Sequence, residues 1–322
     1  MALTISDDLL TAFSRQTTVD LYANSVWAAL LNRDYEQDIS GAYDVEIQDV
    51  TIPATVTTRT RGSNWKTPTE QSATQIKMAM DQTYEVVQKM SYEDIRQSPD
   101  IGWLERMRAK AAINTAAFID ANIAAYVASL TFDAADKLAV GSGNTNVLTL
   151  TGPNYYKGTG LRLVTEAARQ AARHFYRKNV ISGQSLDGQT AGTLWMLISP
   201  ELFSVLQLDM LDRGFQWDQL TDQVLDNRIR TQEGWSGRLF GIDIIVSNSV
   251  AVPATSGSNK WVVYVGTRKA LTMAIDQPVT SFFEPGGNIT GPNYQLNQAG
   301  IFGRARVNPS LITEITFATA DS

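Results

Sequence analysis

The spacing of hydrophobic positions changes several times along this chain. Between residues 6 and 33, apolar side chains recur every three or four residues, as at Leu9 and Phe13 and again at Val26 and Leu30. This spacing predicts an amphipathic helical arm. Between residues 45 and 90 the sequence alternates and is rich in threonine and β-branched residues, which predicts two long strands.

A polar stretch with glycine, asparagine and proline separates these two strands and predicts the tip of a long hairpin. The hairpin has too few apolar side chains on either face to fold alone, so we expect it to be buried against another chain. Its tip carries Arg59, Arg61, Trp65 and Lys66. Three cations without a stacking platform are a weak nucleic-acid motif, so we interpret these four residues as candidate contacts between subunits.

The longest predicted helix covers residues 98–130, with Ser98 as its cap and Pro99 in its first turn. A helix of this length spans about 45 Å. Asn114, Asp120 and Asn122 make it too polar to be a membrane span. Its alanine-rich second half suits a spine against which sheets and loops can lie.

The second half of the chain mixes helices and strands. The pattern predicts a helix at 160–179, a strand at 193–199, a helix starting at Pro200 and a further helix at 218–229. A strand within 237–250 follows, then strands at 260–266 and 270–277 and a closing pair of strands within 301–317. The order of these elements indicates an α+β protein.

Three stretches carry a resemblance to a known family: MLISPELFSVLQL (196–208), GRLFGIDIIVSNSV (237–250) and VYVGTRKALTMAI (263–275). Their order is similar to the middle domain of the major capsid proteins of tailed bacteriophages, the fold first described for phage Hong Kong ninety-seven. The chain departs from the commonest family pattern at Asp243, where a proline often stands. The resemblance covers nearly the full length and implies five segments: an N-terminal arm (1–44), an extended loop (45–92), a peripheral domain with the spine helix (93–159), an axial domain (160–285) and a return to the peripheral domain (286–322).

The resemblance also implies a function and partners. Such proteins assemble in the host cytoplasm into the icosahedral shell of the virion, as hexamers and pentamers around packaged double-stranded DNA. Because this chain begins almost directly with its arm, we expect a separate scaffolding protein. A portal protein is a further implied partner, and a decoration protein is left open. We expect no sequence-specific DNA binding, no membrane and no cofactor.

Charge and composition narrow the alternatives. The net charge is −6 without long runs of one sign, so the sequence shows no basic tail or patch that would hold nucleic acid through its phosphates. The absence of cysteine excludes a disulfide framework and a thiolate zinc site. The patterns GxSxG, GxxxxGK[ST] and GxGxxG after a strand do not occur, so no catalytic or metal site is predicted.

Two residues still require a test against an enzymatic function. His174, the only histidine, falls in an arginine-rich helical pattern, and we interpret it as an ordinary helix residue. Asp243 lies in an apolar strand and must face water, a subunit contact or a nearby arginine. Two other functions stay open: the shell of an encapsulin-type compartment, and a hydrolase with an unrecognised carboxylate site.

Overall fold

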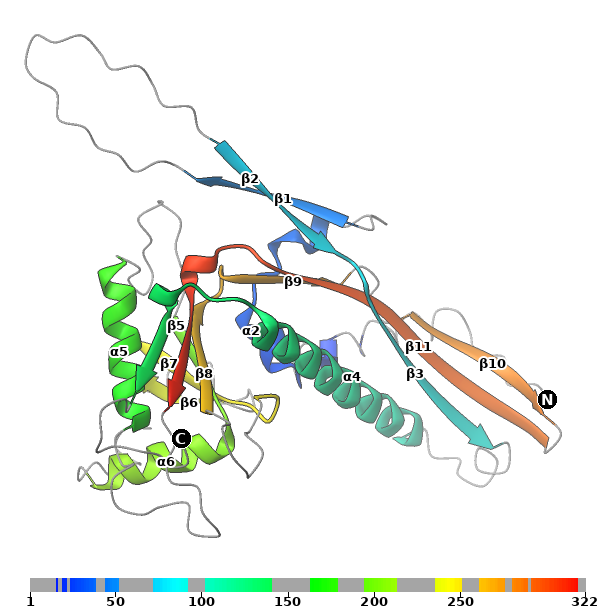
Figure 1. The fold of residues 1–322 in the computed structure, drawn as a ribbon. Coiled ribbons are helices and arrows are strands. Elements are labelled where there is room, and N and C mark those ends of the chain that lie inside the picture. Colours follow the sequence, from blue (N-terminus) through cyan, green and yellow to red (C-terminus); the bar gives the residue numbers. More distant parts are fainter. Residues whose placement is uncertain are drawn as a thin grey trace, which may run out of the picture.

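A computed structural model of the chain describes residues 16, 19–21, 24–38, 44–51, 72–91, 102–140, 163–178, 194–212, 235–250, 261–275, 280–288 and 291–317. Two layers organise these residues: a long antiparallel sheet that is accompanied by one helix, and a six-stranded sheet with helices around it (Figure 1). A two-stranded ribbon projects from the junction of the two layers.

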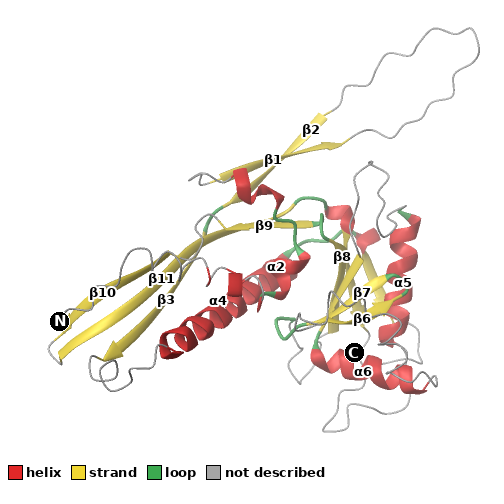
Figure 2. Cartoon of the chain, turned by 180° about the vertical axis from the view of Figure 1, so that it is seen from behind, coloured by secondary structure: helices red, strands yellow, loops and turns green. Residues whose placement is uncertain are grey.

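The long sheet is built around β11 (Gly291–Arg306), which pairs from Asn293 to Phe302 with β3 (Gln82–Ser91). On its other side β11 pairs first with β10 (Thr280–Asn288) and then with β9 (Leu271–Ile275), and all of these pairings are antiparallel. Helix α4 (Gly102–Ser129) runs beside this sheet (Figure 2). Its 28 residues correspond to a length of about 42 Å, which confirms the predicted spine helix.

The ribbon consists of β1 (Asp44–Thr51) and β2 (Ser72–Ala79), paired antiparallel from Asp44 with Ala79 to Thr51 with Ser72. The predicted hairpin is therefore present, but its second strand is shorter than expected. After Met80 and Asp81 the chain leaves β1 and joins β11 as β3. The alternation of buried positions continues through this break, because Met78, Met80 and Tyr84 are all buried, so the break has no signal in the sequence pattern.

The second sheet has the strand order β4-β12-β8-β5-β7-β6. Its strands are β4 (Lys137–Val140), β12 (Ile312–Phe317), β8 (Trp261–Thr267), β5 (Leu194–Ile198), β7 (Ile242–Val246) and β6 (Trp235–Leu239). All five side chains of β5 are buried, so the centre of the sheet is covered on both faces. Helices α5 (Leu163–Arg177) and α6 (Pro200–Asp212) lie against this layer, and α6 begins at the proline predicted to start it.

Two features differ from the sequence-based expectation. The stretch 237–250 is not one strand, because Phe240 and Gly241 form a two-residue turn that makes β6 and β7 a hairpin. Strand β12 lies between β4 and β8, so strand pairing crosses the expected boundary between residues 285 and 286 and places the last described strand in the six-stranded sheet. Sequence pattern identifies a strand but not the strand with which it pairs.

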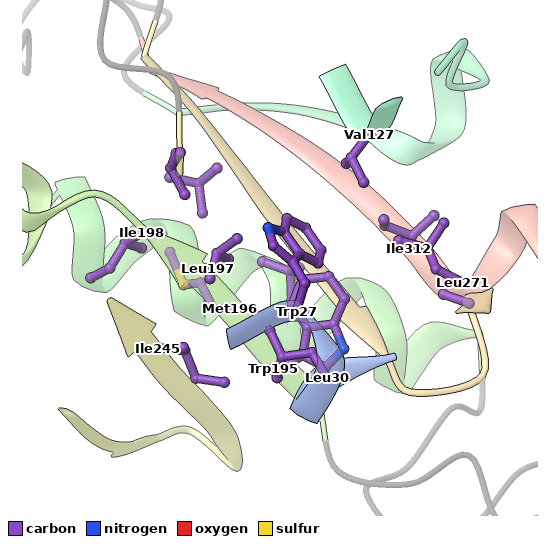
Figure 3. Packing of buried hydrophobic residues seen from close by; sticks show 14 of the residues in the cluster. Trp27, Leu30, Val127, Trp195, Met196, Leu197, Ile198, Ile245, Leu271 and Ile312 are labelled. Atoms are coloured by element: carbon purple, nitrogen blue, oxygen red, sulfur yellow. The ribbon is translucent and has the colours of Figure 1, made fainter. Parts of the chain in front are cut away.

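One continuous hydrophobic core joins the helical arm to the six-stranded sheet (Figure 3). Trp27 of the arm helix α2 (Val26–Leu30) is fully buried, and its ring meets Trp195 of β5 edge to face with centroids 5.9 Å apart. Leu271 of β9 and Ile312 of β12 belong to the same core. The arm is therefore part of the folded body of the protein and contacts both layers.

Candidate assembly surfaces

The base of the ribbon is held by a small hydrophobic core of its own. Its buried members are Val45, Ile47, Met78, Met80, Ala274 and Ala305. They come from β1, β2, the link to β3, β9 and β11, so the ribbon base is fixed to the long sheet. The hairpin was expected to be buried against another chain, and this is wrong at its base, since Val45 and Ile47 pack within the same chain.

Gly303 of β11 explains how closely the ribbon base approaches the sheet. A Cβ atom at Gly303 would lie 2.5 Å from the Sδ of Met80 and 2.7 Å from the carbonyl oxygen of Ala79. No side chain fits at these distances, so the chain can cross β11 here only above a glycine.

The four predicted contact residues of the hairpin tip, Arg59, Arg61, Trp65 and Lys66, lie outside the described residues.

Asp120, in the middle of α4, holds the arm. It is 6% exposed, and its carboxylate accepts hydrogen bonds from the Ser25 hydroxyl (2.6 Å) and from the backbone N–H groups of Val26 (3.0 Å) and Trp27 (3.2 Å). Ser25 in turn accepts from the N–H of Ala28 as the N-cap of α2. Burial raises the pKa of Asp120, and these three hydrogen bonds partly oppose the shift. The sequence marked Asp120 only as a polar residue in the spine helix.

Two serines that follow β7 also help to hold the arm. The hydroxyls of Ser247 and Ser249 lie 2.7 Å apart, and the indole N–H of Trp27 donates to Ser249 Oγ over 3.2 Å. These serines therefore position a structural tryptophan. Asp243, on the same strand, accepts from the guanidinium of Arg238 across the β6–β7 hairpin (2.7 and 3.4 Å). Of the three partners considered for Asp243, the structure selects the arginine.

Around His174 the structure brings together titratable groups that lie far apart in the sequence. Its Nε2 lies 2.9 Å from Oδ1 of Asp136, a buried carboxylate next to β4, and Lys178 pairs with the same oxygen. Lys178 also donates to the carbonyl of Ser310. This cluster ties α5 to the edge of the six-stranded sheet, and it contains no hydroxyl or thiol nucleophile among the described contacts. Within the described part of the chain, no group of three or more His, Asp or Glu side chains could hold a metal ion.

A protein-family model described as phage capsid protein matches residues 82–309, more than two thirds of the chain. The chain belongs to this phage capsid protein family. It is thus a subunit of a capsid shell and a component of the virion. A search of curated proteins finds no match.

Solved structures agree with this capsid protein in fold. A protein of Mycobacterium phage Che8 is 18% identical, with a TM-score of 0.55 over 92% of each chain. The capsid of Ralstonia phage GP4 is 13% identical, with a TM-score of 0.60 over 90% of this chain and 87% of that one. A virus-like particle from Pyrococcus furiosus is 11% identical, with a TM-score of 0.53 over 96% and 98%. The α+β capsid fold expected from the sequence is confirmed.

Proposed function

We propose that this capsid protein forms the icosahedral head of a tailed bacteriophage around double-stranded DNA, as hexamers and pentamers and with the help of a separate scaffolding protein. The observation that carries the proposal is the ribbon β1–β2. Within the described residues these two strands pair only with each other, and they point away from the body of the protein (Figure 1). A two-stranded hairpin is marginally stable by itself.

The ribbon base is fixed by its own small core, so its direction relative to the body is set before assembly. We infer that the tip, with Arg59, Arg61, Trp65 and Lys66, lies on a neighbouring copy. Aromatic and arginine side chains are enriched in such interfaces. The ribbon is therefore fixed at its base and needs a partner at its tip, as expected for a subunit that overlaps its neighbours.

The outer side of α4 gives a second line of support. Ile113 and Phe118 are 51% and 47% exposed, and the exposed positions that follow along this side include Ala117, Ala121, Ala125 and Ala128. By length and composition alone, Arg108–Ser129 could cross a membrane. Its other side is packed within the chain and Asp120 accepts three hydrogen bonds there, as in the core helix of a folded domain. A helix that is apolar on both sides is normally covered on both sides, which supports burial of this face in an assembly.

We assign the long sheet and α4 to the peripheral domain, and the six-stranded sheet with α5 and α6 to the axial domain around the five- and sixfold axes. Head-to-tail contacts between copies close into a shell only when the curvature is correct, which is the physical reason for a scaffolding protein. A portal protein is expected in the same head. The chain's net charge of −6 suits a wall that encloses DNA without holding its phosphates.

Expression alone and together with the products of neighbouring genes tests this function. We expect shells or capsomer rings in negative-stain images and by sedimentation velocity, with uniform shells only when the scaffolding protein is present. Uniform shells from the protein alone would contradict the scaffolding proposal. Shells that enclose a cargo protein would identify an encapsulin-type compartment. Dispersed small particles under every condition would support the hydrolase alternative and overturn the capsid proposal.

A matched variant isolates the ribbon. Because Thr51 and Ser72 are paired in register, residues 52–71 can be replaced by Asn-Gly, which forms a two-residue hairpin turn. The shortened protein keeps the ribbon base and its core, so its thermal unfolding should match that of the wild type. We expect it to form no shells. Normal shells from this variant would show that the tip is not an intersubunit contact.

A further inference from the structure

The turn between β6 and β7 contains a strained residue. Leu239 pairs with Ile242, so Phe240 and Gly241 are the two central residues of the turn, and both have a positive φ, 52° and 81°. Such turns favour asparagine followed by glycine, because a bulky side chain in the left-handed region is strained. Phe240 is the only non-glycine residue with a positive φ among the described residues. A strained residue at the surface points to a function, because the strain has to be offset by something that the residue does.

Phe240 is only partly covered by its own chain. It is 44% exposed, and β6 is the last strand of the six-stranded sheet in the described part of the protein. The hydroxyl of Tyr176, from α5, lies 3.7 Å from the position that a Cβ atom on Gly241 would occupy. Tyr176 is itself 49% exposed. Two half-exposed aromatic side chains from separate elements therefore lie at the same turn, at one end of the sheet edge.

Arginines continue this surface along α5. Arg169, Arg173 and Arg177 recur every fourth residue and are exposed, as is Tyr176. Arg169 pairs with Glu166 at 2.8 Å. Residues 163–178 hold four basic residues and one acidic residue, so the rest of the chain is more acidic than the net charge of −6 suggests. The spacing of the arginines in the sequence already indicated one side of a helix, and the structure shows that this side is exposed and lies near the turn between β6 and β7.

We propose that Arg173, Tyr176 and Arg177 of α5 together with Phe240, here called the turn patch, bind an acidic surface of the next copy of this chain in the capsomer. The inference rests on the proposed shell function. Copies of the same chain surround each subunit in a shell, and a patch that meets a different surface of its neighbour forms the head-to-tail contact that closes a ring. Phenylalanine, tyrosine and arginine are the residue types that protein interfaces enrich.

Nucleic acid fits the turn patch less well. Arginines alone could contact phosphates, but duplex DNA has no unstacked bases to receive the two aromatic rings. An acidic neighbour satisfies the arginines, and an apolar contact at its centre covers Phe240 and Tyr176. The same arrangement accounts for the strain at Phe240, because a phenylalanine is retained where asparagine would fit the turn better.

The test replaces Phe240 by asparagine, which suits the turn but removes the ring. We expect the Phe240→Asn protein to have a melting temperature equal to or above that of the wild type, because the backbone strain is relieved. Its critical concentration for assembly, measured by light scattering with the scaffolding protein present, should rise at least about tenfold. Phe240→Tyr keeps an aromatic ring on the same turn and is the control, with a critical concentration close to that of the wild type.

A second variant tests the arginines. Arg173→Gln with Arg177→Gln should raise the critical concentration and weaken its dependence on salt, because screening acts on these charges.

Two outcomes would overturn this inference. One is that the wild type forms shells and Phe240→Asn assembles at the same critical concentration, which would leave the proposed function intact. A lower melting temperature for Phe240→Asn would also overturn it, since the ring would then serve the fold. Salt-dependent binding of duplex DNA by the unassembled wild type, lost in the arginine variant while assembly is kept, would assign the patch to nucleic acid instead. Absence of wild-type shells under all conditions would refute the proposed function and this inference together.

Discussion

Replacing Asp120 by alanine should detach the arm from the spine helix. The carboxylate is the acceptor for the Ser25 hydroxyl and for the N–H groups of Val26 and Trp27, at 2.6, 3.0 and 3.2 Å. The hydroxyl can rotate towards another acceptor, but the two backbone N–H groups cannot. A buried donor left without a partner costs about 1–3 kcal/mol, so two of them cost about 2–6 kcal/mol.

The substitution also removes a buried charge, and this offsets part of the lost stability because burial disfavours the ionised form of Asp120. We therefore expect the free energy of unfolding to fall by about 3 kcal/mol, which corresponds to an increase of roughly a hundredfold in the unfolded population. The loss should be concentrated in α2, whose N-terminus the carboxylate holds.

Urea unfolding monitored by tryptophan fluorescence measures the total effect, and hydrogen exchange of the α2 amides measures its location. Asp133→Ala is the matched control: Asp133 is an exposed aspartate whose side chain makes no capping hydrogen bond. That control should change the free energy of unfolding by less than about 0.5 kcal/mol. A similarly small change for Asp120→Ala, or unchanged exchange in α2, would refute the role assigned to Asp120.

Three further predictions concern other contacts of the fold. Gly303→Ala should lower the free energy of unfolding by about 1–3 kcal/mol in urea, because its Cβ would overlap the Met80 side chain and the backbone before it; an unchanged midpoint would contradict the close crossing. Burial raises the pKa of Tyr84 from 10.0 to about 12, so the folded state binds a proton that the unfolded state releases, and stability should be lost between pH 10 and 12. Tyr84→Phe should reduce that loss, with the part due to the half-buried Tyr264 remaining, and should not destabilise the protein at pH 7, since the buried Tyr84 hydroxyl has no hydrogen-bond partner among the described residues; a stability decrease at pH 7 would show otherwise. A double-mutant cycle with Arg238→Met and Asp243→Asn should give a coupling of about 0.2–1 kcal/mol, as for a cross-strand ion pair with an exposed arginine, and a value near zero would show that water satisfies the carboxylate.

The arm, the ribbon, the spine helix and the start of α6 were determined by the sequence alone. Helical spacing indicated the arm and the spine helix, alternation and β-branched residues indicated the ribbon, and Pro200 marked the start of α6. These features depend on local backbone preferences and on which side of an element is apolar, and both are encoded within a few residues of each position. The resemblance built on the order of the elements led to the family that the comparison confirmed.

Only the tertiary structure decided which elements pair and which side chains meet. A buried alternating pattern is the same whether its partner strand is near or far in the chain, so the change of partner after Met80 and the place of β12 between β4 and β8 were not predictable. The contacts of Asp120 with the arm and of His174 with Asp136 join residues that are 93–95 and 38 positions apart. The strain at Phe240 likewise depends on the β6–β7 hairpin, where the sequence pattern predicted a single strand. Contacts between distant residues depend on how complete layers pack, and no local pattern of residues records that packing.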